Sequence, residues 1–85
     1  AEGAEPALIA EGWDALERMR RCGRRIEDRD TRRQVQELAD TAEDVLVRLG
    51  EEPQRAMPLR RFLNFYLPNA ASVAEGWVAL EGLHR

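Results

Sequence analysis

Apolar residues recur at helical spacing through three long segments of the chain. The first segment, from Pro6 to about Asp28, carries two adjacent apolar rows: Ile9, Trp13, Leu16, and beside them Ala15, Met19, Cys22, Ile26. The second, from about Thr31 to Gly50, carries one row that Leu46 widens: Val35, Leu38, Ala42, Val45, Leu49. The third, from Leu59 to about Leu83, carries a further row: Leu59, Leu63, Tyr66, Ala70, Val73, Trp77, Leu80. Steps of three and four residues predict three amphipathic α-helices.

Polar caps, glycine and proline mark the expected helix ends. The first break falls at 28–30, where Thr31-Arg32-Arg33-Gln34 has the form of a capping box and Asp30 is an equally good cap. Gly50 suits the end of the second helix. Pro53 and Pro58 bracket a short connection, for which one helical turn is expected, and Pro58 opens the third helix.

The expected fold is all-α, an antiparallel up-down-up bundle of three helices. Pro68 lies inside the third apolar row and removes one backbone hydrogen bond, so we expect the third helix to be kinked there. A complete break is the alternative, but the row keeps its phase across the proline, which favours one bent helix. Short connections place the helices side by side, with each apolar row closing against the other two.

Length and composition restrict the class of protein. A chain of 85 residues forms a single domain, and its first residue is alanine, so we expect a fragment or processed product of a longer protein. A net charge of −3 argues against a nucleic-acid binder. One cysteine excludes an internal disulfide framework and fits a reducing, cytoplasmic compartment. No apolar run is long enough to span a membrane, so anchoring by a membrane-spanning helix would need a further segment.

Candidates for catalysis and metal binding are few. Cys22 lies among arginines that would activate an accessible thiol, but its place in the apolar row with Met19 and Ile26 favours a core cysteine. The spacing of Glu81 and His84 occurs in di-iron bundles, which need a second such pair that this chain lacks. We therefore predict no catalytic residue, no metal and no cofactor.

Arginines concentrate where the first helix turns into the second. Residues 18–33 hold eight arginines and three acidic residues. A solvated, ion-paired helix end is one interpretation of this arginine tip. The other is a docking site for an acidic protein or an anionic membrane surface, for which the candidate residues are Arg21, Arg24, Arg25, Arg29 and Arg32.

The aromatic run near the start of the third helix is the second candidate surface. Phe62, Phe65 and Tyr66 bring more bulk than one core face accepts, and Phe65 points away from the side that the other two share. One of them should therefore face solvent, a protein partner, a second copy, or the remainder of a longer chain. The alternative is that the connection between Pro53 and Pro58 folds over them.

One sequence segment recurs. Residues 10–17 and 74–81 match at seven of eight positions, including a Gly-Trp pair at Gly12 and Gly76. The flanking residues do not match, so coincidence or a shared packing need explains the echo as well as duplication does. Glycine inside a helix costs about 1 kcal/mol relative to alanine, and close helix approach beside the indole could offset it.

The run Arg61-Phe62-Leu63-Asn64-Phe65-Tyr66-Leu67-Pro68, followed by a long apolar helix with Trp77, resembles the C-terminal region of the 5-bromo-4-chloroindolyl phosphate hydrolysis family, the XpaC-like bacterial proteins. The resemblance covers roughly residues 30–82. It departs after the proline, where Asn69 stands in place of the family's threonine, and in lacking a membrane-embedded N-terminal segment. It implies a bacterial protein associated with toxic-anion (tellurite) resistance and supplies no catalytic residues.

The leading hypothesis is a non-catalytic helical protein-interaction domain that acts through its aromatic run or its arginine tip. The first alternative is a hydrolase of 5-bromo-4-chloroindolyl phosphate-type esters, as the family name implies. Phosphate hydrolysis needs a nucleophile or a metal beside the cations that stabilise the phosphoryl group, and this chain offers only the arginines. The second alternative is an adaptor on anionic membrane surfaces.

Overall fold

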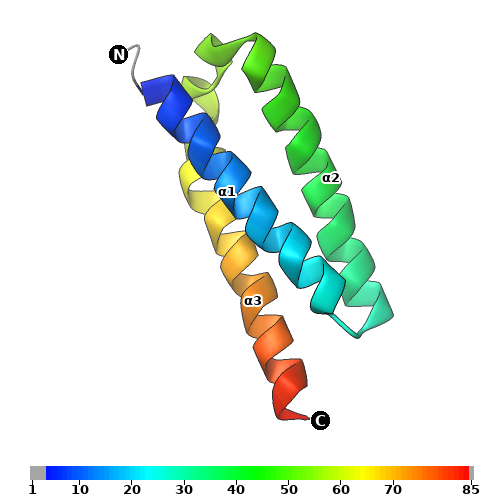
Figure 1. The fold of residues 1–85 in the computed structure, drawn as a ribbon. Coiled ribbons are helices and arrows are strands. Elements are labelled where there is room, and N and C mark those ends of the chain that lie inside the picture. Colours follow the sequence, from blue (N-terminus) through cyan, green and yellow to red (C-terminus); the bar gives the residue numbers. More distant parts are fainter. Residues whose placement is uncertain (1–3, 85) are drawn as a thin grey trace.

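The computed structural model describes residues 4–84 as three long helices joined by short connections (Figure 1). Helix α1 spans Ala4–Arg25, α2 spans Arg29–Glu51 and α3 spans Leu67–Leu83. Between α2 and α3 lie two 3₁₀ turns, η1 (Pro53–Arg55) and η2 (Met57–Leu59), and a π-helical segment, η3 (Phe62–Tyr66). No strand occurs within residues 4–84, so the predicted all-α class is confirmed.

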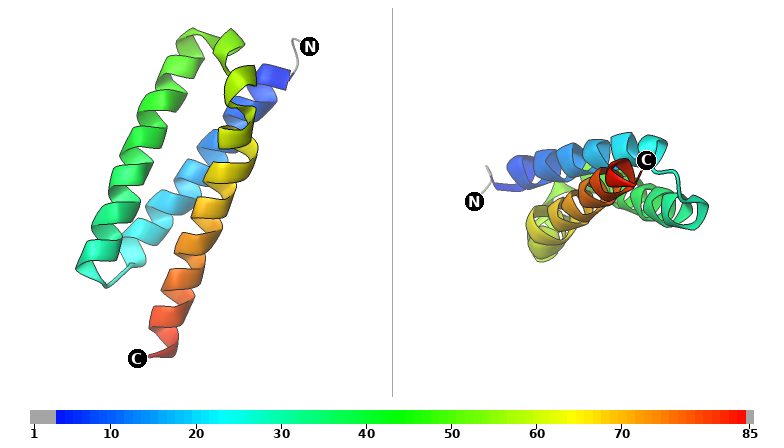
Figure 2. Two further views of the ribbon diagram at one scale, coloured as in Figure 1. Left: turned by 180° about the vertical axis from the view of Figure 1, so that it is seen from behind. Right: turned by 90° about the horizontal axis from the view of Figure 1, so that it is seen from below.

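Helix α1 is the shared partner of the other two helices. In Figure 1, α1 and α3 run in one direction and α2 runs in the other. Helix α1 packs along most of α2 and of α3, whereas α2 and α3 barely touch. The left view of Figure 2 shows α2 and α3 running side by side, with α1 behind them. The expectation that each helix closes against the other two is therefore wrong on one side, and the α2–α3 side is open.

The core follows the wide apolar stripe of α1. That helix was expected to face two neighbours, and most of its predicted apolar positions are buried between α2 and α3, although Trp13 remains 40% exposed. Small side chains on the facing helices allow close approach to α1. The buried residues of the core are Ala15, Leu16, Met19, Cys22, Ile26, Ala39, Ala42, Leu46, Leu49, Ala56, Leu63, Leu67, Ala71 and Ala74.

The buried face of α3 differs from the predicted one. Leu67, Ala71 and Ala74 pack on α1, in line with the buried Leu63 of η3. Most of the predicted row is exposed instead, namely Leu59, Tyr66, Val73, Trp77 and Leu80. The reason is that α3 is apolar on every side and has no preferred face. Spacing alone cannot then say which side meets α1.

The chain stays helical through Pro68, and its irregular turn comes just before the proline. Residues 62–66 form a π-helical segment in which the Leu67 N–H donates to the Phe62 carbonyl. Pro68 has no N–H and its ring would crowd the Asn64 carbonyl in a regular α-helix. The wider turn accommodates this proline. The predicted kink at Pro68 is thus replaced by a π-helical segment at 62–66, and the alternative of a complete break is wrong.

The α1–α2 turn lies two residues earlier in the chain than expected, at residues 26–28. Helix α1 ends at Arg25 and α2 begins at Arg29, because Asp28 is the cap in place of Asp30 or Thr31. The Asp28 carboxylate accepts hydrogen bonds from the Thr31 N–H (2.9 Å) and the Thr31 hydroxyl (2.6 Å). These bonds lower the pKa of Asp28, the side-chain bond most strongly. Thr31 therefore acts as the donor to this cap and is not itself the cap.

Glu81 ties the end of α3 to the α1–α2 turn. Its carboxylate accepts from the backbone N–H groups of Glu27 (2.8 Å) and Asp28 (2.9 Å) and from the Trp77 indole (2.9 Å). The Glu27 backbone bond is the largest of several that lower the pKa of Glu81. The ionised carboxylate therefore holds two segments together that are more than fifty residues apart in sequence.

The substitution Glu81→Gln is expected to weaken the hydrogen bonds between residue 81 and the α1–α2 turn, because an amide offers one acceptor oxygen where the carboxylate offers two. Hydrogen exchange of the Glu27 and Asp28 amides should become roughly tenfold faster. In the unsubstituted protein the tie is complete above the usual carboxyl pKa of about 4.3 and is lost as the pH falls through the lowered pKa of Glu81. The Trp77 indole N–H resonance should report that transition.

The control for the Glu81 prediction is Glu37→Gln, on the exposed side of α2. That change should leave the exchange of the Glu27 and Asp28 amides as it was. Equal exchange rates in the Glu81 and Glu37 variants would show that the carboxylate does not hold the turn.

Candidate functional site

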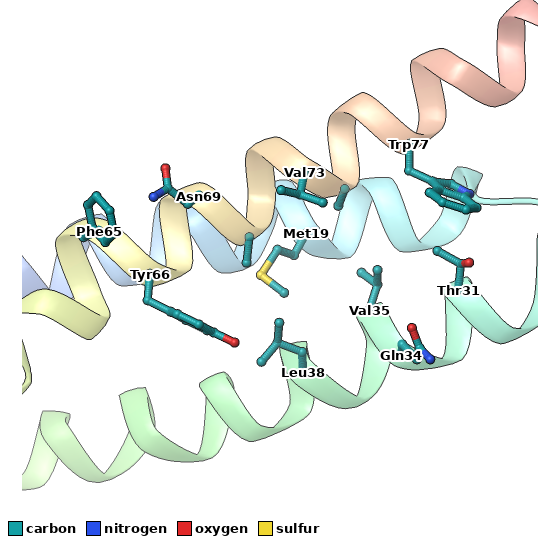
Figure 3. Close-up of a pocket in the computed structure, with 12 residues that line it drawn as sticks. Met19, Thr31, Gln34, Val35, Leu38, Phe65, Tyr66, Asn69, Val73 and Trp77 are labelled. Atoms are coloured by element: carbon teal, nitrogen blue, oxygen red, sulfur yellow. The ribbon is translucent and has the colours of Figure 1, made fainter.

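The open side between α2 and α3 is an apolar groove of about 520 Å³ (Figure 3). Helix α1 forms its floor through Met19, α2 forms one wall and α3 the other. The lining residues are Met19, Thr31, Gln34, Val35, Leu38, Phe65, Tyr66, Asn69, Ala70, Val73, Ala74 and Trp77. None of them is charged. The groove is therefore suited to an apolar ligand surface and offers no countercharge to an ion.

Two aromatic residues shape one end of the groove. Figure 3 shows Tyr66 reaching from its helix toward α2, whereas Phe65 points away from the interior. The Tyr66 ring stacks on Phe62, with ring centroids 5.6 Å apart and an interplanar angle of 15°. Phe62 is half-buried and packs against the core, so it supports Tyr66 and is not itself open to a partner. Phe65 is 67% exposed at the rim.

The rest of the apolar wall comes from residues that helical spacing assigns to the core. Val73, which is 72% exposed, and Trp77, which is 40% exposed, belong to this wall on α3. Leu80 also faces outward on α3 but lies outside the groove. On the opposite wall, Val35 and Leu38 of α2 are only half-buried. One feature of the sequence could have indicated this exposed wall: residues 67–83 contain only two charged side chains. A helix that is apolar all round needs cover on more than one side.

The structure divides the arginine tip into paired and unpaired members. Arg18 binds Glu75 through two nitrogens (2.5 and 3.1 Å), and Arg20 binds Asp40 (2.7 Å) and Glu43 (3.1 Å). The hydrogen bond from Arg18 lowers the pKa of Glu75. Both pairs clamp α1 to its neighbours. They are partly exposed and add little stability each.

Four of the five predicted tip residues are exposed and make no salt bridge or side-chain hydrogen bond within residues 4–84, namely Arg21, Arg24, Arg25 and Arg29. The fifth, Arg32, is half-buried and donates to the Ile26 carbonyl (3.3 Å), which is a structural role. The tip is therefore in part the ion-paired surface that one interpretation expected. None of helices α1 to α3 combines the length and apolarity needed to cross a bilayer.

Cys22 is a buried core residue. It lies under a depression of about 270 Å³ lined by Arg18, Arg21, Arg25, Glu75 and Val78. Burial raises the pKa of the thiol, and the lowering effect of the nearby arginines does not overcome it. A raised pKa leaves little thiolate at neutral pH. The prediction of a core cysteine is confirmed.

The chemistry open to the described residues is limited. Within residues 4–84, no three His, Cys, Asp or Glu side chains lie together as metal ligands would. His84 lies at the exposed end beyond α3, and the Glu81 carboxylate is taken up by backbone amides. Phe65, Tyr66 and the groove thus lie on one side of the molecule, while the unpaired arginines gather at one end. The structure does not combine these two surfaces into one site.

Comparison with known proteins identifies a family to which the chain is similar. The profile of a family described as 5-bromo-4-chloroindolyl phosphate hydrolysis protein matches residues 7–84. The match covers almost the whole chain, including α1, which the resemblance noted in the sequence did not reach. No curated protein and no solved structure matches.

Proposed function

Because the chain belongs to the 5-bromo-4-chloroindolyl phosphate hydrolysis protein family, we propose that it is a non-catalytic helical interaction domain of that family. Its groove between α2 and α3 takes up an apolar α-helix of a protein partner. In this role the domain contributes to toxic-anion (tellurite) resistance, which the XpaC-like resemblance implies, by holding a partner and not by acting on the anion.

The groove is the observation that carries this proposal. It is open along the helix axes, uncharged, and walled by half-buried or exposed apolar side chains such as Leu38 and Val73. A helix laid along it would complete a four-helix core, with its own apolar residues at steps of three and four meeting both walls. Exposed apolar surface of this extent marks an interaction site.

A phosphatase is less well supported. The phosphoryl group would need a nucleophile or a metal beside its cationic partners. The unpaired arginines Arg21 and Arg25 lie beside Cys22, but that thiol is buried and its pKa is raised. The groove itself has no charged lining residue. Binding is therefore the function that the geometry favours.

Titration with a soluble amphipathic helical peptide tests the proposal. The probe is a 17-residue peptide with leucine and alanine on one face and lysine on the other, added to isotope-labelled protein. Resonances of groove residues, such as the Val35 and Leu38 methyl groups and the Trp77 indole, should shift in a saturable way. The substitution Val73→Asp should weaken binding at least about tenfold, because it places a charge in the apolar wall.

The matched control for the titration is Val47→Asp. Val47 is 51% exposed on α2 but does not line the groove. The Val47→Asp variant should bind the peptide as tightly as the unsubstituted protein does. Shifts spread over the whole surface, or equal losses in the Val73 and Val47 variants, would contradict a helix-binding groove.

The unpaired arginines favour a second candidate function, in which the protein is an adaptor on an anionic membrane surface. In that case the protein should sediment with vesicles containing phosphatidylserine at low salt and be released at high salt. The double substitution Arg24→Glu and Arg25→Glu should abolish sedimentation. No sedimentation at low salt would end this candidate.

A further inference from the structure

The outer face of η3 and α3 carries a row of exposed, uncharged and mostly apolar residues. Its residues follow an alternating spacing of three and four, and we call them the outer seam: Tyr66, Asn69, Val73, Gly76, Leu80 and Leu83. All six are exposed. This is the heptad spacing with which helices pair in coiled coils.

We infer that the outer seam pairs with the outer seam of a second copy of this chain, antiparallel, so that each α3 covers the groove of its partner. The inference rests on the proposed function, since it names the helix that occupies the groove. The pair is symmetric, with the same surface used by both copies.

Charge permits this self-pairing. Helix α3 carries only two charged side chains, Glu75 and Glu81. Glu75 is bound by Arg18 of α1, and Glu81 is bound by the backbone of the α1–α2 turn, so both charges are engaged on the side that faces α1. The outer seam contains no charge. Two copies therefore meet without like-charge repulsion, and the seam offers no countercharge that would favour a charged partner.

The exposed area is sufficient for a stable pair. Six large side chains on this side are between 40% and 78% exposed: Phe65, Tyr66, Val73, Trp77, Leu80 and Leu83. Together they expose roughly 600 Å² of largely apolar surface. A standard interface buries about 800 Å² per partner. The half-buried wall of α2 supplies part of the remainder when the partner's α3 lies in the groove.

The shapes of Val73 and Gly76 favour the antiparallel orientation. Val73 is a projecting side chain, and a Cβ added at Gly76 would meet no atom within 4 Å. In an antiparallel pair centred between these two residues, each Val73 lies over the partner's Gly76, and each Tyr66 lies opposite the partner's Leu83. A parallel pair would set valine against valine and leave a gap at the glycines.

The arginine tip favours the same orientation. It lies beside the C-terminal end of α3, because Glu81 binds the α1–α2 turn. A parallel pair would bring two tips together, each with the unpaired residues Arg21, Arg24, Arg25 and Arg29. An antiparallel pair places them at opposite ends of a molecule that is 48 Å long. That distance exceeds the screening length at physiological salt several times over.

Sedimentation equilibrium over a wide concentration range tests the inference. We expect a monomer–dimer equilibrium in the unsubstituted protein. Val73→Asp should raise the dimer dissociation constant roughly 100-fold, because the interface would bury two unpaired carboxylates. Val47→Asp should leave it unchanged. Both residues are exposed, so circular dichroism should show that both variants fold.

The outcomes separate this inference from the proposed function. A protein that stays monomeric at all concentrations but still binds the amphipathic peptide in its groove overturns the second copy as the occupant and leaves the proposed function standing. A monomer that binds no peptide overturns both. A dimer that Val73→Asp does not weaken has its interface elsewhere, which also overturns the inference.

Disulfide cross-linking tests the orientation. In a Cys22→Ala background, a mixture of the Val73→Cys and Gly76→Cys proteins should cross-link faster than either protein alone, because the two positions face each other across the antiparallel pair. Faster cross-linking of each variant with itself would indicate a parallel pair and overturn the proposed arrangement.

Discussion

Replacing Leu63 by alanine is expected to destabilise the domain by about 3–4 kcal/mol. Leu63 has no exposed surface and packs in the core where η3 meets α1. Truncation removes buried apolar contacts and leaves a cavity that neighbouring helices cannot fill. A domain of this length has a total stability of about 4–13 kcal/mol, so a large share would be lost. Urea denaturation followed by circular dichroism measures the change as a lower midpoint with an unchanged slope.

The control for Leu63 is Leu83→Ala. Leu83 is 78% exposed in the last turn of α3, so its truncation should change the stability by less than about 0.5 kcal/mol. Leu83→Ala should instead weaken self-association, since Leu83 belongs to the outer seam. Equal losses of stability at positions 63 and 83 would mean that the buried face of α3 has been placed wrongly.

Replacing Gly12 by valine is expected to cost about 2–3 kcal/mol. A Cβ at this position would lie 2.7 Å from the Leu46 Cδ2 atom and 3.0 Å from the Leu63 Cδ2 atom. Both leucines are fully buried, so neither can move aside without opening the core. Removing the glycine also gains a few tenths of a kcal/mol of helix propensity, which is too little to offset the overpacking. The same denaturation experiment measures the result.

Gly76→Val is the matched control, because the Ala-Glu-Gly-Trp sequence around Gly12 recurs around Gly76. Nothing lies within 4 Å of a Cβ there, so in the monomer the change should be neutral or stabilise by a few tenths of a kcal/mol. Because Gly76 belongs to the outer seam, the comparison is made at protein concentrations too low for self-association. Similar effects at positions 12 and 76 would contradict the close approach of Leu46 and Leu63 to α1. The close helix approach that the sequence suggested thus holds at Gly12 and not at Gly76.

Helix α1 could be predicted from the sequence because its polar and apolar residues are well separated. Met19, Cys22 and Ile26 are buried as their spacing predicts, and the two-row stripe does face two helices. The exception is Trp13, which lies on the edge of the stripe. Strong amphipathicity fixes the rotation of a helix about its axis, and the helix needs no further information from its neighbours.

Helix α3 could not be oriented in this way. Its residues are apolar on all sides, so a row through Tyr66, Val73 and Leu80 fits the helical period as well as the row that is actually buried. The choice is made by contact with α1, where Ala71 and Ala74 allow close packing. Tertiary packing of this kind is not encoded in local spacing. The groove between α2 and α3 could therefore not be predicted from the sequence.

The candidate residues were predicted in part. Phe65 and Tyr66 do line the groove, because an aromatic run with too much bulk for one face must leave some of it outside. The partners of the arginines could not be predicted, since the pairing of Arg18 with Glu75 depends on how α3 packs on α1. Whether these surfaces bind a partner stays a prediction.

The most direct test of binding without catalysis is to incubate the purified protein with 5-bromo-4-chloroindolyl phosphate, with and without added Mg²⁺ or Zn²⁺, and to measure release of the indole product. The proposed function predicts no release above the buffer rate under either condition. Turnover that Arg24→Ala abolishes, in a variant that still folds, would contradict it and establish the domain as a hydrolase.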